Sequence, residues 1–219
     1  MLKNYLTVAI RNLWKHKFYS IINVLGLAIG LACFIFILIY VKDEIGYDRY
    51  HEKAERTYRI NFDGFAFDQD LNFAVVGAQV GPIILEEYPE IEQQCRFRQR
   101  GAYTINYEDQ SYREEKWVFA DSTLFDVFSF DLIKGDPETA LAEPNTIVLT
   151  EEIARKYFGE EDPIGKSLTV DNDDLYRVTG VMKKIPRNTH FDFNIFASLS
   201  TLDESRNPTW LNNNFQTYV

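Results

Sequence analysis

Acidic side chains are missing from the start of this chain, and cysteine and histidine are scarce throughout. The first 41 of the 219 residues contain no Asp or Glu, whereas the remaining residues carry 33 acidic and only 19 basic side chains. This acidic excess excludes a protein whose main partner is nucleic acid, because affinity for phosphates depends on Lys and Arg.

Charge is also absent from residues 20–41, which are strongly apolar. Ser20 and Asn23 are their only strongly polar members, and 14 of these 22 residues are Ile, Leu, Val or Phe. At about 1.5 Å per residue, a helix of this length reaches roughly 33 Å, enough to cross a hydrocarbon layer of about 30 Å. We therefore predict a transmembrane helix over residues 20–41.

A cleaved signal is the alternative reading of such a segment. The apolar run is longer than the core of about 7 to 15 residues that a secretory signal has, and no small-x-small cleavage site follows it. A lipoprotein signal at Cys33 would leave the apolar residues 34–41 after the lipidated cysteine. Both patterns favour a retained anchor.

The charges beside this segment predict its orientation. The basic residues before it are Lys3, Arg11, Lys15 and Lys17, and the acidic residues that follow it are Asp43, Glu44 and Asp48. Basic flanks stay in the cytoplasm. We expect residues 1–19 to form a cytoplasmic interfacial helix on the membrane lipid, with a plain polar lead-in as the alternative. Residues 42–219 would then lie on the extracytoplasmic side of the membrane.

Small residues recur inside the apolar segment. Gly26 and Gly30 form G-x-x-x-G, and Ala28 and Ala32 repeat the spacing two positions later. Small residues four apart allow a second membrane helix to approach closely, so we predict helix packing here. The alternative is composition alone, since Gly and Ala are common in such helices.

The two cysteines do not predict a disulfide. Cys33 falls in the expected membrane segment and Cys95 in the exported part, so the two thiols cannot meet. The exported part must fold by ordinary burial, and residues 42–219 are long enough to do so.

Patterning in residues 42–219 predicts a mixed α+β domain with antiparallel hairpins. The expected helices are residues 47–58, residues 78–87, a short helix capped by Asp121 and a helix capped by Thr150. The expected strands are residues 59–67, 95–107, 112–119, 146–149, 166–170, 176–183 and 191–199. Hairpin turns are expected at residues 108–110 and 171–174.

Two motifs resemble ligand sites without matching them. Gly159 to Ser167 resembles a phosphate-binding loop, but it has five residues between its glycines instead of four and three acidic residues inside. Asp171 to Asp174 resembles the start of a calcium loop but lacks the central Gly and the distal Glu. We interpret both as turns.

The histidines at positions 16, 51 and 190 are scattered, and no pair of carboxylates stands out by spacing. The sequence therefore predicts no catalytic residue, no cofactor and no metal site, and it does not predict an enzyme.

Residues 2–60 resemble the N-terminal end of the MacB-like, FtsX-like permease subunits of ABC transporters. The junction motif of that family resembles Tyr47-Asp48-Arg49-Tyr50-His51. Further similar segments are residues 56–59, 135–141, 146–150, 156–159 and 162–166, Pro186, residues 188–190 and residues 191–193.

The resemblance implies an inner-membrane subunit that transmits motion and performs no chemistry itself. A separate cytoplasmic ABC ATPase would bind ATP, and a second permease subunit would complete a dimer. A periplasmic adaptor or a substrate such as a peptide, antibiotic or lipoprotein would meet the exported domain. A helix that begins at Tyr47 would then act as a stiff lever out of the membrane.

Family members carry at least three further membrane helices after the periplasmic domain, whereas residues 212–219 read as the start of a strand. We therefore expect a fragment of a longer permease. A single-pass anchored binding or adaptor module is the alternative, and a membrane-tethered hydrolase is a third possibility.

Overall fold

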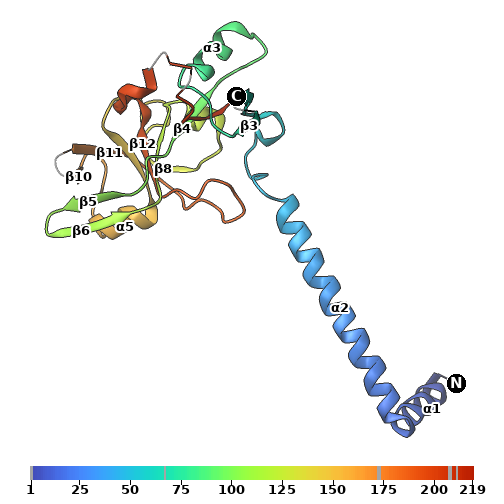
Figure 1. Cartoon of the computed structure of the whole chain (residues 1–219). Helices are drawn as coiled ribbons and strands as arrows, with labels where there is room; N and C mark the ends of the chain where they lie inside the picture. The colour runs from blue at the N-terminus through green and yellow to red at the C-terminus, as the bar shows by residue number, and fades with distance from the viewer. Residues whose placement is uncertain (1, 67, 172–173, 207–208, 211) are drawn as a thin grey trace. The chain divides into compact units, whose positions relative to one another are not determined.

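The computed structural model describes residues 2–66, 68–171, 174–206, 209–210 and 212–219 (Figure 1). By its internal contacts the chain divides into two compact units, Met1–Tyr47 and Asp48–Val219.

The first unit consists of two helices, α1 (Leu2–Lys15) and α2 (Lys17–Ile45). The Ser20 hydroxyl donates a hydrogen bond of 3.1 Å to the Leu13 carbonyl and so ties the two helices together. Within the described residues, α2 is the one helix long and apolar enough to cross a membrane. It extends beyond the predicted span of residues 20–41 at both ends, and its apolar side chains are exposed, a surface suited to lipid.

The prediction of a helix over residues 47–58 is wrong. Helix α2 ends at Ile45, and turns follow it up to the short 3-10 helix η1 (Ala54–Arg56). Asp48 has a φ of 57°, which a right-handed helix does not allow. Its backbone N–H donates to the carbonyl of Asn188 and so makes a tertiary contact. A continuous lever helix from Tyr47 therefore does not form.

The second unit is built on one mixed sheet, which has eleven strands within the described residues. They are β1 (Arg59–Ile60), β4 (Cys95–Arg98), β5 (Tyr103–Tyr107), β6 (Gln110–Glu114), β7 (Trp117–Ala120), β8 (Leu132–Lys134), β9 (Thr146–Thr150), β10 (Ser167–Val170), β11 (Asp174–Met182), β12 (Ile195–Ser198) and β13 (Gln216–Tyr218). Their order is β1-β13-β4-β7-β12-β9-β11-β10-β5-β6, and β8 pairs with β11. Two pairs, β7 with β12 and β9 with β11, are parallel, and the others are antiparallel.

Smaller elements complete this unit. Strands β2 (Phe62–Ala66) and β3 (Gln69–Phe73) form a separate hairpin. The helices are α3 (Val80–Glu87), α4 (Leu124–Val127), α5 (Glu151–Phe158), η2 (Leu199–Thr201) and η3 (Asp203–Arg206).

Apolar side chains are buried on both faces of the main sheet. Along β12, Ile195 and Ala197 belong to one buried cluster and Phe196 to the other, because successive side chains of a strand point to opposite faces. Helix α5 packs on β9 and β11 and contributes to the first cluster. The second cluster is rich in phenylalanine from the connecting segments: Phe128, Phe130, Phe191 and Phe193. Fully burying each such side chain stabilises the fold by about 1.5–3 kcal/mol.

The local predictions hold in part. Helices α3 and α5 confirm the predictions for residues 78–87 and for the segment after Thr150, and hairpins β5–β6 and β10–β11 are present. The runs 95–107 and 112–119 each split into two strands, and β12 is shorter than the predicted 191–199. Phe67, at the end of predicted strand 59–67, lies outside the described residues.

Of the two predicted helix caps, Thr150 occupies the cap position of α5, whereas the prediction of Asp121 as the cap of α4 is wrong. The hydroxyl of Thr150 makes no capping hydrogen bond and is buried without a partner among the described residues. Thr123 occupies the cap position of α4, while the Asp121 carboxylate binds Arg96.

Candidate functional site

The residues predicted to pack in the membrane all lie on α2. Gly26, Ala28, Gly30 and Ala32 are exposed, and a Cβ atom added at either glycine would meet nothing within 4 Å. Both pairs of small residues are open in the described chain, so their contact with another helix stays a prediction.

The residues predicted as a junction divide between the two units. Tyr47 ends the first unit, and Asp48 to His51 begin the second. Of these four, Asp48, Tyr50 and His51 pack into the domain, whereas Arg49 is exposed. We call residues 48–53 the junction segment.

Asp48 fastens this segment to the loop before β12. Its carboxylate accepts hydrogen bonds from the Thr189 hydroxyl at 2.5 Å and from the backbone N–H of His190 at 2.9 Å, and it pairs with the His190 ring. Burial alone would raise the pKa of Asp48, but the bonds from Thr189 and His190 outweigh it and hold the pKa below its usual value. The carboxylate is therefore ionised at neutral pH.

His51 enters a cage of aromatic rings. It is 6% exposed, and its ring centroid lies 5.2 Å from those of Phe128 and Phe130 and 5.8 Å from that of Phe191. The neighbouring Tyr50 ring lies 3.9 Å away, and burial raises the pKa of its hydroxyl. The segment thus places two aromatic side chains against the phenylalanine cluster of the sheet.

The protonation state of His51 follows from this environment. The backbone N–H of Ser129 donates to Nδ1 at 3.1 Å, so the proton of the neutral ring is on Nε2. Burial lowers the pKa of His51 to about 4, although the negative charge of Asp48 acts in the opposite direction. At neutral pH the ring is an uncharged aromatic side chain.

Two further bonds extend the attachment along the chain. The backbone N–H of Glu52 donates to the Ser129 hydroxyl at 2.9 Å, and Lys53 Nζ donates to the Asp126 carbonyl at 2.6 Å. The junction segment is therefore held by two segments, residues 126–130 at the end of α4 and beyond it, and residues 188–191 before β12. Sequence reasoning singled out residues 188–191 through the family resemblance but had no signal for residues 126–130.

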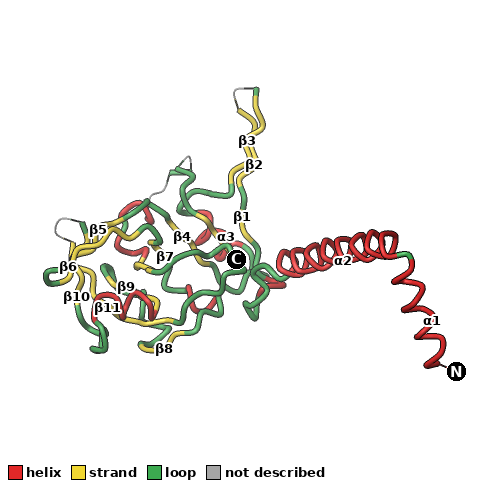
Figure 2. Tube along the Cα trace, turned by 90° about the horizontal axis from the view of Figure 1, so that it is seen from below, coloured by secondary structure: helices red, strands yellow, loops and turns green. Residues whose placement is uncertain are grey.

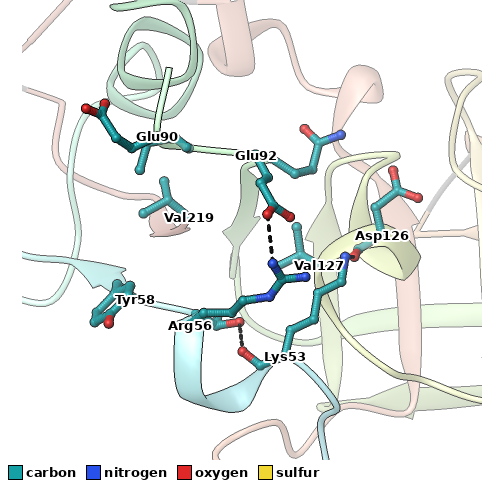
Figure 3. A pocket seen from close by; sticks show the side chains of 11 residues that line it. Lys53, Arg56, Tyr58, Glu90, Glu92, Asp126, Val127 and Val219 are labelled. Atoms are coloured by element: carbon teal, nitrogen blue, oxygen red, sulfur yellow. Dashed lines mark hydrogen bonds and ion pairs between the residues drawn. The ribbon is translucent and has the colours of Figure 1, made fainter. Parts of the chain in front are cut away.

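A cavity of about 200 Å³ lies beside the end of this segment (Figure 3). Lys53 and Arg56 approach it from one side, and Val219 and the loop after α3 line it elsewhere. Arg56 pairs with Glu92 at 2.7 Å across the cavity, and both side chains are exposed. Charges of both signs at its rim give no preference for an anion or a cation.

The segment that resembled a phosphate-binding loop is a turn. Gly159 follows α5 with a φ of 60°, and the chain reaches β10 with Lys166 paired to Glu161. This order, helix then strand, is the reverse of a phosphate-binding loop. Asp171 begins the β10–β11 turn, whose residues 172 and 173 lie outside the described residues. Among the residues described, no group of three His, Cys, Asp or Glu could hold a metal ion.

A buried ion pair that the sequence did not reveal joins the inner strand β4 to the residue after β7. Arg96 Nε and Nη2 donate to the two Asp121 oxygens at 2.8 and 2.9 Å, and Nη1 donates to the carbonyls of Ala78 and Ser205. Four segments meet at this one guanidinium group. This group therefore links these segments inside the domain.

The fold and the sequence both match known domains outside the membrane. A profile of the MacB-like periplasmic core domain matches residues 20–219. A domain from Porphyromonas gingivalis, provisionally described as part of a permease protein, is 25% identical with a TM-score of 0.69, over 77% of this chain and 74% of that chain. A search of curated proteins finds no match.

Two more distant structures share the fold. The extracellular domain of the noncanonic ABC-type transporter YknZ from Gram-positive bacteria is 17% identical, with a TM-score of 0.53, over 75% of this chain and 82% of that chain. The periplasmic region of MacB from Actinobacillus actinomycetemcomitans is 17% identical, with a TM-score of 0.51, over 74% and 73%. The chain belongs to the MacB-like periplasmic core domain family of ABC transporter permeases. This confirms the resemblance seen in the sequence.

Proposed function

We propose that the chain is the part of an ABC permease that carries movement from its first membrane helix into the domain outside the membrane. A separate cytoplasmic ATPase would supply the ATP-driven step, and a second permease subunit would complete the complex. The N-terminus would lie in the cytoplasm and residues after 41 in the periplasm. The substrate class is a peptide, an antibiotic or a lipoprotein, as the family resemblance implies.

The observation that supports this proposal is the attachment of the junction segment directly after α2. Only Gly46 and Tyr47 separate the helix end at Ile45 from Asp48. The three Cα–Cα steps from Ile45 to Asp48 span at most roughly 11 Å, so the connection between the helix end and the first bond to the domain is short. Because Asp48, His51 and Lys53 then hold two separate segments, a displacement of the helix end acts on the domain over a few residues.

A linker insertion tests this proposal. A short Gly-Ser linker between Tyr47 and Asp48, in the permease assembled with its ATPase, should stop substrate export while ATP hydrolysis and domain stability persist. The same linker in the β5–β6 turn after Glu108 is the matched control, because that turn is exposed and lies outside the junction. Export that survives the first insertion would contradict coupling through the junction and would favour an anchored adaptor, which only needs to bind.

A further inference from the structure

The hairpin β2–β3 stands apart from the main sheet. Figure 2 shows it projecting away from the rest of the domain. Strand β2 follows β1 after one residue, but β2 and β3 pair only with each other in the described chain. A two-stranded hairpin is marginally stable in water by itself, so a contact with another molecule would stabilise it.

Its strand register gives the hairpin two different faces. Phe62, Leu71 and Phe73 share one face, and the rings of Phe62 and Phe73 stack with centroids 6.2 Å apart. The Phe62 ring also lies over Gly64, where a Cβ would come within 2.7 Å of it. The opposite face carries Asp63, Phe65, Asp70 and Asn72.

Apolar rings of this hairpin are open to solvent. The Phe65 side chain is 69% exposed and that of Phe73 is 42% exposed. None of the described hairpin residues belongs to either buried cluster of the domain. Exposed aromatic rings on a projecting element are typical of a protein interaction site.

Charge around the hairpin has one sign. Residues 60–94 contain seven acidic side chains and no Lys, Arg or His. On the hairpin itself, Asp63, Asp68 and Asp70 are exposed, and none of them takes part in an ion pair among the described residues. The apolar surface is therefore bordered by uncompensated negative charge.

We propose that this hairpin is a docking site for a cationic amphipathic segment of a partner protein outside the membrane. An apolar side chain of that segment would cover Phe65, and its Lys or Arg side chains would pair with Asp63 and Asp70, which lie on the same face of the hairpin. A second copy of this domain is a poor occupant, because residues 42–219 carry 33 acidic and 19 basic side chains and would repel it. An anionic lipid surface is disfavoured by the same repulsion. The proposal goes beyond the proposed function and does not depend on it.

A peptide titration tests the charge requirement. The full chain in phosphatidylcholine nanodiscs is titrated with a fluorescent synthetic helix of Lys and Leu, and with a second peptide in which Glu replaces Lys. Fluorescence anisotropy should show binding of the Lys peptide alone, after subtraction of binding to empty nanodiscs. The double substitution Asp63→Asn with Asp70→Asn should weaken this binding about fivefold. It leaves the Phe62–Phe73 stack in place and so tests docking without removing packing.

Matched substitutions on other hairpins are the controls. Phe65→Ser should weaken binding, whereas Leu175→Ser, at a side chain that is 61% exposed, and Asp109→Asn should not. Equal effects of the hairpin and control substitutions, or equal binding of the Glu peptide, would overturn the proposal. So would an analytical ultracentrifugation result in which Phe65→Ser separates a dimer into monomers while peptide binding is unchanged, because the hairpin would then bind a second copy.

Discussion

The Thr189 hydroxyl donates a hydrogen bond of 2.5 Å to the Asp48 carboxylate, although 141 positions of sequence separate the two residues. Asp48 follows the membrane helix almost directly, and Thr189 lies in the loop before β12. The backbone N–H of Asp48 donates to the carbonyl of Asn188, and the backbone N–H of His190 donates to the Asp48 carboxylate. Backbone and side-chain groups therefore both hold the two segments together. The junction segment and the loop before β12 are therefore fixed to each other.

Substitution Asp48→Asn should weaken this contact. The amide oxygen of the Asn side chain still accepts one hydrogen bond. The amide nitrogen cannot accept a second one from Thr189 or His190, and the negative charge beside the His190 ring is lost. We expect the free energy of unfolding to fall by about 1–2 kcal/mol, measured by urea denaturation of the full chain in detergent. Asp109→Asn, in an exposed turn, should change it by less than about 0.5 kcal/mol. Equal losses in the two variants would argue against the contact.

The buried His51 predicts a specific loss of stability in acid. Its pKa falls from an ordinary 6.5 to about 4 on folding, so the unfolded chain takes up a proton that the folded chain does not. The free energy of unfolding should therefore decrease as the pH falls from about 6.5 to about 4, by on the order of 2 kcal/mol. Thermal unfolding followed by near-ultraviolet circular dichroism across this range measures the slope.

The matched variant for that experiment is His51→Phe. Phenylalanine fits among the Phe128, Phe130 and Phe191 rings but cannot take up a proton, so its stability should depend less on pH across the same range. The backbone N–H of Ser129 loses its acceptor, which costs some stability at every pH. Parallel curves for the variant and the unchanged chain would show that another group titrates.

The sequence predicts those elements of the fold that depend on a few adjacent residues. The apolar run of residues 20–41, the helical pattern after Thr150 and the turn between β5 and β6 each depend on a few adjacent residues, and all three appear in the structure. The sequence pattern predicts β4 and β5 as one strand, because side-chain polarity alternates along both. They separate because β4 pairs with β7 and β13, whereas β5 pairs with β6 and β10. The pairings of β4 with β7 and β13, and of β5 with β10, join residues far apart in the sequence and leave no local pattern.

The junction segment depends even more on contacts between residues far apart in the sequence. Tyr50, Ala54 and Tyr58 repeat every four residues and favour a helix, yet the segment folds as turns. Burial of Tyr50 and His51 among the phenylalanine rings outweighs the modest gain from helical propensity, which is at most about 0.7 kcal/mol per ordinary residue. His51 looked isolated in sequence because its partners Ser129 and Phe191 lie far along the chain.

The buried pair of Arg96 and Asp121 should be among the most sensitive positions in the domain. Arg96→Met keeps much of the side-chain volume but leaves the Asp121 carboxylate buried without its partner, together with the carbonyls of Ala78 and Ser205. Loss of one member of a buried pair costs about 3–5 kcal/mol. Arg56→Met breaks the exposed pair with Glu92 and should cost less than about 1 kcal/mol. Similar unfolding midpoints for the two variants would contradict this assignment.

Alanine substitutions at two glycines with nearly the same φ distinguish the cost of backbone strain from the cost of a steric clash. Gly101 and Gly135 have φ values of 94° and 97°, a region that other residues rarely adopt. A Cβ at Gly101 would meet nothing within 4 Å, whereas a Cβ at Gly135 would lie 2.3 Å from the Thr179 carbonyl oxygen. Gly101→Ala should therefore lower the free energy of unfolding by about 1 kcal/mol, and Gly135→Ala by at least about 2 kcal/mol more. Urea denaturation of both variants measures the difference, and equal losses would mean that the β8 edge yields to the added methyl group.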